Sequence, residues 1–215
     1  MTRWPRPSSA AWKLSWDRTV HLPWWAPLTA VAVVLAVQPV LGRLDIDTQF
    51  ALVGVVDWIG HLATGVVLVA LLWPPRRMAV AIIVFSVVLD IDHLPLELGT
   101  DVLTDGTPRP YTHSLLTILV VLVAAGLLRS QVLLGAAIGL AGHLLRDLGT
   151  GDGVPLLWPL SDAGASVPFA LYIGVLTGLA AVAALRSAPG GAPPTARRTR
   201  LRSPTAGRAA ARARG

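Results

Sequence analysis

The sequence has no cysteine among its 215 residues, which excludes disulfide bonds, thiolate nucleophiles and cysteine ligands for metals. A metal site in this chain therefore has to use histidine, aspartate or glutamate. Charged residues are also scarce, at 14% of the chain against about 25% in a soluble domain. Hydrophobic residues make up 53%, and the mean hydropathy is +0.62. These values exclude an ordinary soluble domain and indicate a membrane protein.

Apolar segments separated by short polar connections recur along most of the chain. A helix needs about 20 apolar residues to cross the hydrocarbon core of a bilayer. The pattern predicts an all-α, polytopic membrane helical bundle of about six transmembrane helices. The predicted spans cover residues 26–42, 51–73, 78–91, 113–129, 132–148 and 167–185.

The ends of the chain differ in composition from the helical domain, which is predicted over residues 26–186. Residues 1–25 combine basic residues with tryptophans. This mixture suits a membrane interface, with a disordered lead-in as the alternative. Residues 187–215 are rich in alanine, proline, glycine and arginine without a periodic apolar face, which predicts a disordered Arg-rich tail.

Basic residues predict the orientation of the bundle. With the N-terminus in the cytoplasm, 15 of the 18 lysines and arginines lie on the cytoplasmic side. The positive-inside rule then places both termini of the multi-pass protein in the cytoplasm. The expected partner of the basic ends is the lipid bilayer, and no nucleic acid is expected.

Ionisable residues gather near the outer ends of four predicted spans. Asp57 and His61 are four residues apart, as are His143 and Asp147, so each pair shares one helix face. Between them lie the D-I-D-H sequence at 90–93 and His113. Because successive spans alternate in direction, all of these residues are predicted to meet at the extracytoplasmic side.

The local geometry around Asp90 stays open at this stage. A helix puts Asp90 and His93 on one face, whereas an extended chain puts Asp90 and Asp92 together. Asp57 and His61 can alternatively form a buried hydrogen-bonded pair, and His113 can belong to a helix start.

A divalent cation would offset the cost of ionised carboxylates in a membrane, about 2.5–3.5 kcal/mol each at mid-bilayer. Imidazole and carboxylate ligands suit zinc, and carboxylate-rich sets suit manganese or iron. The candidate ligands exceed what one catalytic zinc needs, so more than one ion can be accommodated.

Four pieces of the sequence resemble a known family, the membrane-bound metal-dependent hydrolases of bacterial inner membranes of the YdjM type. They are His61, D-I-D-H at 90–93, Y-T-H-S-L at 111–115 and H-L-L-R-D-L-G-T-G-D-G-V-P-L-L-W-P at 143–159. The resemblance implies a metal-dependent hydrolase. Its candidate metal-site residues are His61, Asp90, Asp92, His93, His113, His143 and Asp147.

Two departures from the family pattern bear on the site. Leu89 stands where the family usually has proline, and Pro108 precedes Arg109 where His-Arg is common. Asp57 is a candidate substitute for the histidine that is missing there. The His-x-x-x-Asp spacing is also similar to that of the all-helical zinc phospholipase C and nuclease group, which suggests phosphoester chemistry.

The leading hypothesis is an enzyme in which a metal-activated water attacks an ester or phosphoester at the outer leaflet. The metal is expected to be zinc, with manganese or iron as alternatives. The expected substrate is a phospholipid or lipid-linked compound, with a small periplasmic solute as the alternative. The predicted catalytic residues are Asp57 or Asp92, as a base or ligand-orienting group, and Arg109, as a head-group contact for which Arg146 is the alternative. A metal or proton transporter and a non-catalytic membrane scaffold are the competing hypotheses.

Overall fold

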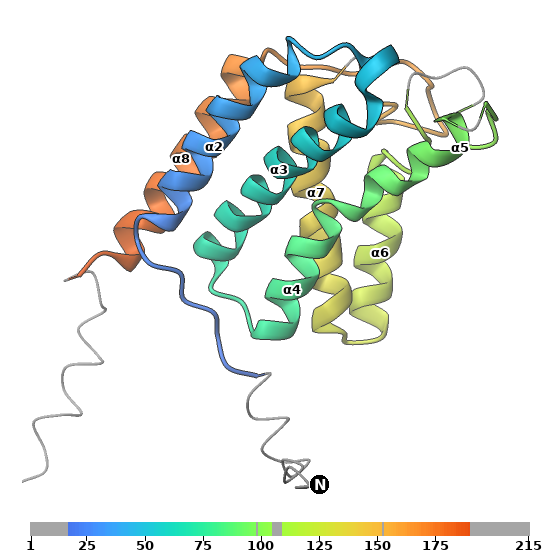
Figure 1. Ribbon diagram of the computed structural model, residues 1–215. Coiled ribbons are helices and arrows are strands. Elements are labelled where there is room, and N and C mark those ends of the chain that lie inside the picture. The colour runs from blue at the N-terminus through green and yellow to red at the C-terminus, as the bar shows by residue number, and fades with distance from the viewer. Residues whose placement is uncertain (1–16, 98, 105–108, 152, 190–215) are drawn as a thin grey trace, which may run out of the picture.

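The structure of the protein, a computed structural model, describes residues 17–97, 99–104, 109–151 and 153–189 (Figure 1). In these ranges every regular element is a helix, so the predicted all-α class is confirmed for the described part. The elements are α2 (Ala26–Leu41), α3 (Ile46–Leu72), α4 (Arg76–Phe85), the 3-10 helix η1 (Val88–His93), α5 (Leu94–Glu97), α6 (Leu115–Leu127), α7 (Gln131–Thr150) and α8 (Phe169–Ser187).

The six longer helices overlap the six predicted segments, but α4 ends at Phe85, so the prediction that the third segment continues to residue 91 was wrong. Three segments are long and apolar enough to cross a membrane: Leu52–Leu72, Gln131–Thr150 and Phe169–Ser187. The other three, α2, α4 and α6, have 16, 10 and 13 residues. The predicted N-terminal segment before residue 17 and the tail beyond residue 189 lie outside the described residues.

Helix α7 is the centre of the bundle. It packs against α3, α4, α6 and α8, and half of its residues are buried. It begins after Ser130, whose hydroxyl oxygen accepts a hydrogen bond from the backbone N–H of Leu133 over 3.3 Å and so caps the helix start. The central position explains why the polar residues of its last turns are removed from lipid.

Two glycines of α7 allow α4 to approach closely. A Cβ atom built on Gly135 would lie 2.6 Å from the carbonyl oxygen of Met78, and one on Gly139 would lie 2.5 Å from that of Ile82. Small residues at this spacing are a common solution for tight helix contacts in membranes. The approach brings the end of α4, with Ser86, against the face of α7 that carries His143.

On the other flank, α2, α3 and α8 form an apolar core. Val34, Val67, Tyr172 and Leu176 are fully buried there. Figure 1 shows α2 and α8 lying side by side along this edge. Large apolar side chains remain exposed on the outer faces of the bundle, as expected for surfaces that contact lipid, including Leu35, Leu119, Val120, Val123, Leu171 and Val182.

The chain entering α2 is held against the α3–α4 connection. The backbone N–H of Val20 donates to the carbonyl of Pro74 over 2.8 Å, and that of Arg76 donates to the carbonyl of Arg18 over 3.0 Å. Arg186, near the end of α8, donates to the carbonyl of Leu71 over 2.6 Å. The segment before α2, the start of α4 and the end of α8, each of which carries an arginine, therefore share one end of the bundle, the lower end in Figure 1.

Candidate metal centre

The predicted site residues come together at the opposite end of the bundle. Helix α3 contributes Asp57 and His61. Helix α7 contributes His143 and Asp147, one to two turns before its end. The D-I-D-H sequence lies in η1, a 3-10 helix, so of the two alternatives the helical one is observed, with Asp90 and His93 on one face. The fourth contribution is His113, just before α6. Chain reversals between the helices bring side chains from all four segments into contact distance.

The tightest group is formed by His113, His143, Asp90 and Asp147. The Nε2 atoms of the two histidines are 3.2 Å apart. His143 Nε2 lies 3.2 Å from Asp147 Oδ2 and 3.3 Å from Asp90 Oδ1. His113 Nε2 lies 3.4 Å and 3.8 Å from the same two oxygens. Both imidazoles and Asp147 are fully buried.

A second group surrounds His61, which is also fully buried. Its Nε2 atom lies 3.4 Å from Asp57 Oδ2, 3.4 Å from Asp147 Oδ1 and 3.8 Å from Asp90 Oδ2. The His61 and His143 rings stack with centroids 3.9 Å apart. The two groups are therefore adjacent, and Asp90 and Asp147 belong to both.

The protonation pattern of the imidazoles favours a cation. His143 Nδ1 lies 3.0 Å from the carbonyl oxygen of Ser86, which can only accept, so Nδ1 carries a proton. His113 Nδ1 faces Asp92 Oδ2 at 3.3 Å, so a proton on this nitrogen is favoured by the neighbouring carboxylate. In neutral rings the two Nε2 lone pairs then point at each other and at carboxylate oxygens, an arrangement that needs a shared positive charge.

Several atoms of the cluster lack hydrogen bonds. Among the described residues, buried atoms without a hydrogen-bond partner include His61 Nε2, Asp90 Oδ2 and Asp147 Oδ1. Buried polar atoms are normally paired, because an unpaired one costs about 1–3 kcal/mol. A divalent cation coordinated by these atoms would remove that cost, so the donor set fits a metal.

Asp92 and Thr112 lie on the far side of His113 from the Nε2 atoms that meet in the cluster. The Thr112 hydroxyl donates a hydrogen bond to Asp92 Oδ2, the oxygen that faces His113. Burial acts to raise the pKa of the Asp92 carboxyl, but the contacts with His113, His93 and Thr112 outweigh it and hold the pKa at about 2. Asp92 is therefore an ionised group that orients His113.

His93 occupies the edge of the cluster. Its Nδ1 atom is 3.1 Å from Asp92 Oδ1 and 4.0 Å from Asp90 Oδ1, and its side chain is 22% exposed. Together with Asp90 and His113 it can also offer ligand atoms within 4.8 Å of one another. Its position suits a ligand at the solvent side.

The two arginines of this end differ in what they contact. Arg146 is fully buried and pairs with Asp57, to which its Nε donates over 3.1 Å. It is therefore not placed to meet a head group, the alternative role considered from the sequence. Arg109 is 15% exposed, and its Nη1 lies 3.0 Å from Asp147 Oδ2. Arg109 is the arginine at the open side of the cluster.

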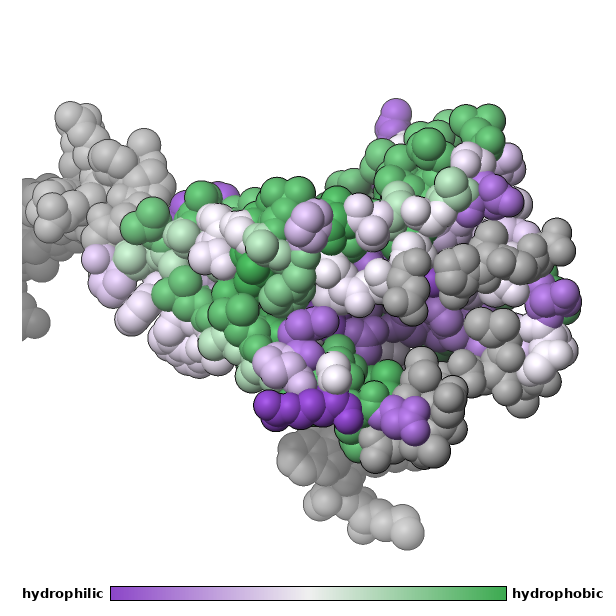
Figure 2. Space-filling view, turned by 90° about the horizontal axis from the view of Figure 1, so that it is seen from above, coloured by the Kyte–Doolittle hydropathy of each residue, from purple (hydrophilic) through white to green (hydrophobic). Residues whose placement is uncertain are grey.

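Polar residues reach solvent from this end of the bundle. Asp57, at 24% exposure, His93 and Arg109 are all partly accessible. Figure 2, which looks down on this end, shows a band of hydrophilic residues set between apolar flanks. These partly exposed side chains therefore connect the buried donors to the surface at this end.

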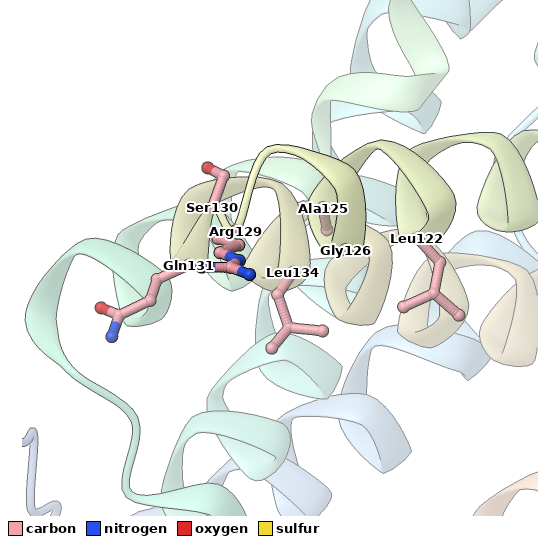
Figure 3. Close-up of a pocket in the computed structure, with 7 residues that line it drawn as sticks. All are labelled: Leu122, Ala125, Gly126, Arg129, Ser130, Gln131 and Leu134. Atoms are coloured by element: carbon pink, nitrogen blue, oxygen red, sulfur yellow. The ribbon is translucent and has the colours of Figure 1, made fainter.

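A shallow apolar pocket of about 280 Å³ lies at the other end of α7, beside the α6–α7 turn (Figure 3). It is lined by Leu122, Ala125, Gly126, Arg129, Ser130, Gln131 and Leu134. None of these residues belongs to the His/Asp cluster, and the pocket carries a single charged side chain. It is separate from the candidate metal centre.

Sequence reasoning missed three parts of the site. The Ser86 carbonyl, the Thr112 hydroxyl as a partner of Asp92, and the Arg146–Asp57 pair were not predicted as contacts. Thr112 adjoins His113 in the Y-T-H-S-L motif, which was a usable signal. Backbone carbonyls carry no sequence signal, so the role of Ser86 becomes visible only in the fold.

Comparison with known proteins supplies a family and no relative. The family model described as YdjM inner membrane protein matches residues 56–210, which include every residue of the cluster. No curated protein and no solved structure matches the chain. The family description gives a location and names no reaction.

Proposed function

Since the chain belongs to the YdjM inner membrane protein family and carries a buried His/Asp cluster, we propose that it is a membrane-embedded metal-dependent hydrolase. The observation that carries the proposal is the convergence of His113, His143 and Asp147, which are fully buried and offer ligand atoms within 4.8 Å of one another. Two imidazoles and a carboxylate are a ligand set used by catalytic zinc.

The cluster resembles a catalytic site more than a structural one. A structural zinc is closed off by four protein ligands, whereas a catalytic metal keeps a position open to water or substrate. Here the donors are buried on one side, but Arg109 and His93 connect them to solvent on the other. Bound zinc, manganese or iron would lower the pKa of a water from about 15.7 to about 7 and polarise a carbonyl or phosphoryl oxygen.

The surrounding residues have distinct roles in this proposal. Asp92 accepts from Thr112 and holds His113 in the orientation that aims its Nε2 at the cluster. The Ser86 carbonyl does the same for His143. Arg109, at the open side, binds the anionic group of the substrate, since a guanidinium pairs well with phosphate.

Charge suggests the side and the substrate. Five arginines lie at turns or helix ends away from the cluster: Arg18, Arg76, Arg77, Arg129 and Arg186. The positive-inside rule favours that end of the bundle as cytoplasmic. All six longer helices would then cross or enter the bilayer, with both termini inside. The cluster would face the outer leaflet, where esters or phosphoesters of phospholipids or lipid-linked compounds are accessible.

The test is hydrolysis by purified full-length protein in lipid nanodiscs. A panel of lipid phosphoesters and carboxyl esters is assayed as purified, after chelation, and after each of zinc, manganese and iron is restored. We expect turnover of at least one ester that is lost on chelation, restored by metal, and absent from His143→Ala. His21→Ala, a histidine at the other end, is the matched control. Turnover that survives full removal of metal contradicts the proposal.

A further inference from the structure

The arrangement of Asp90 and Asp147 indicates how many cations the cluster holds. We infer that it binds two divalent cations side by side, with the carboxylates of Asp90 and Asp147 bridging them. The inference rests on the proposed metal site, and it adds the number of ions, the ligands of each and the class of substrate.

Each bridging carboxylate points its two oxygens at different imidazoles. Asp147 Oδ2 lies 3.2 Å from His143 Nε2, while Oδ1 lies 3.4 Å from His61 Nε2. Asp90 repeats this pattern, with Oδ1 3.3 Å from His143 Nε2 and Oδ2 3.8 Å from His61 Nε2. One cation cannot use both oxygens of both carboxylates and all three imidazoles in the tetrahedral set that zinc prefers.

The first donor set has the size of a single coordination sphere. It consists of His113 Nε2, His143 Nε2, Asp90 Oδ1 and Asp147 Oδ2. Atoms bound at about 2.0–2.1 Å to a tetrahedral ion are about 3.3–3.4 Å from one another. The five known separations in this set are 3.2, 3.2, 3.3, 3.4 and 3.8 Å.

The second donor set is built around His61. Its Nε2 atom lies 3.4, 3.4 and 3.8 Å from Asp57 Oδ2, Asp147 Oδ1 and Asp90 Oδ2. Asp57 is fixed in this position because Arg146 occupies its other oxygen, Oδ1. His61 itself makes no hydrogen bond within the described residues through either ring nitrogen. A buried imidazole with three carboxylate oxygens around one nitrogen is a complete site for a second cation.

Charge connects the two ions to the substrate class. The carboxylates of Asp57, Asp90, Asp92 and Asp147 are opposed by the guanidinium groups of Arg109 and Arg146, which leaves two negative charges when the imidazoles are neutral. One divalent cation neutralises that charge, and a second makes the centre doubly positive. Paired ions are used to hold the attacking and leaving oxygens of a phosphoryl group. The inferred substrate is therefore a phosphoester.

Manganese provides a direct probe of the ion count. Full-length protein in detergent is stripped with chelator, dialysed against Mn²⁺ or, in parallel, Zn²⁺, and its metal content is measured per chain. Low-temperature electron paramagnetic resonance is recorded on the Mn²⁺ sample. We expect two ions per chain with each metal and an exchange-coupled Mn²⁺ signal, which requires two ions sharing ligands.

Two variants separate the sites. His61→Ala, or Asp57→Asn if the first does not fold, should retain one Mn²⁺ and change the coupled signal to that of an isolated ion. His21→Ala should keep two ions and the coupled signal. A single uncoupled ion per chain in the unaltered protein overturns the two-cation inference and leaves the proposed hydrolase intact. No bound Mn²⁺ or Zn²⁺ contradicts both.

Discussion

The guanidinium of Arg146 on α7 donates to Asp57 on α3, with Arg146 Nε 3.1 Å from Asp57 Oδ1. This pair joins the two helices that carry the i, i+4 motifs of the cluster. Gly60 makes room for it, since a Cβ atom there would lie 2.3 Å from Arg146 Cζ. The pair leaves Asp57 Oδ2 directed at His61, so Arg146 is a positioning residue.

Removing one member of the Arg146–Asp57 pair should cost more stability than its share of the loss when both members are replaced. Arg146→Met leaves the Asp57 carboxylate without its partner, and loss of one member of a buried pair costs about 3–5 kcal/mol. Because Asp57 is 24% exposed, we expect a loss near the lower end of that range. The double variant Asp57→Asn/Arg146→Met should lose less stability than the sum of the single variants. Denaturation in detergent measures these free energies, and additive losses would show that the two side chains are not coupled.

Asp92 should affect metal affinity without removing the metal site. Its carboxylate faces His113 Nδ1 and accepts from Thr112. Loss of such an orienting partner typically weakens metal affinity about 10–100-fold. Asp92→Asn should show a loss of this size in competition with a chelator of known affinity, and Thr112→Val a smaller one. An Asp92→Asn protein that binds no metal at all would make Asp92 a direct ligand.

Arg109 should affect substrate binding more than metal binding. Replacement by glutamine removes the positive charge beside Asp147. We expect KM for a phosphoester to rise about tenfold or more, equivalent to about 1.4 kcal/mol, with unchanged metal content. Arg43→Gln, an exposed arginine following α2, is the control and should leave KM unchanged. Unaltered KM in Arg109→Gln would exclude this residue as the anion contact.

Close packing of α4 on α7 should be sensitive to a single methyl group. Gly139→Ala would put a Cβ atom 2.5 Å from the Ile82 carbonyl oxygen and 3.0 Å from Phe85 Cβ. Overpacking of this kind costs about 1–3 kcal/mol, and it would also displace Ser86 from His143. The midpoint of thermal unfolding and the metal content should both fall. Gly178→Ala on α8 is matched in chemistry, has open space around it, and should change neither.

Much of the fold followed from the sequence because membrane helices are set by long apolar runs. Five of the six longer helices lie where hydropathy and polar breaks predicted them. The exception is the third, which was predicted to reach residue 91 and ends at Phe85. Beyond Phe85 the chain changes to the 3-10 helix η1. This end of α4 packs closely on α7 at Gly139, and the local sequence does not show that Gly139 contacts α4.

The residues of the candidate site were predictable as a set, and their contacts were not. Two His/Asp pairs at helical spacing and alternating helix direction were enough to expect Asp57, His61, His143 and Asp147 near one another. Which oxygen faces which nitrogen depends on side-chain rotamers and on helix rotation. The separate roles of Asp90 between two histidine groups and Asp92 behind His113 therefore appear only in three dimensions.

The central claim is that imidazoles and carboxylates from separate helices hold a divalent cation. Elemental analysis of protein purified without added metal tests it most directly, with His143→Ala and His21→Ala measured in parallel. We predict at least one zinc, manganese or iron ion per chain in the unaltered protein and in His21→Ala, and a substantial loss in His143→Ala. Equal metal content in all three proteins would contradict the account. So would the absence of metal from all three if none of them takes up added metal.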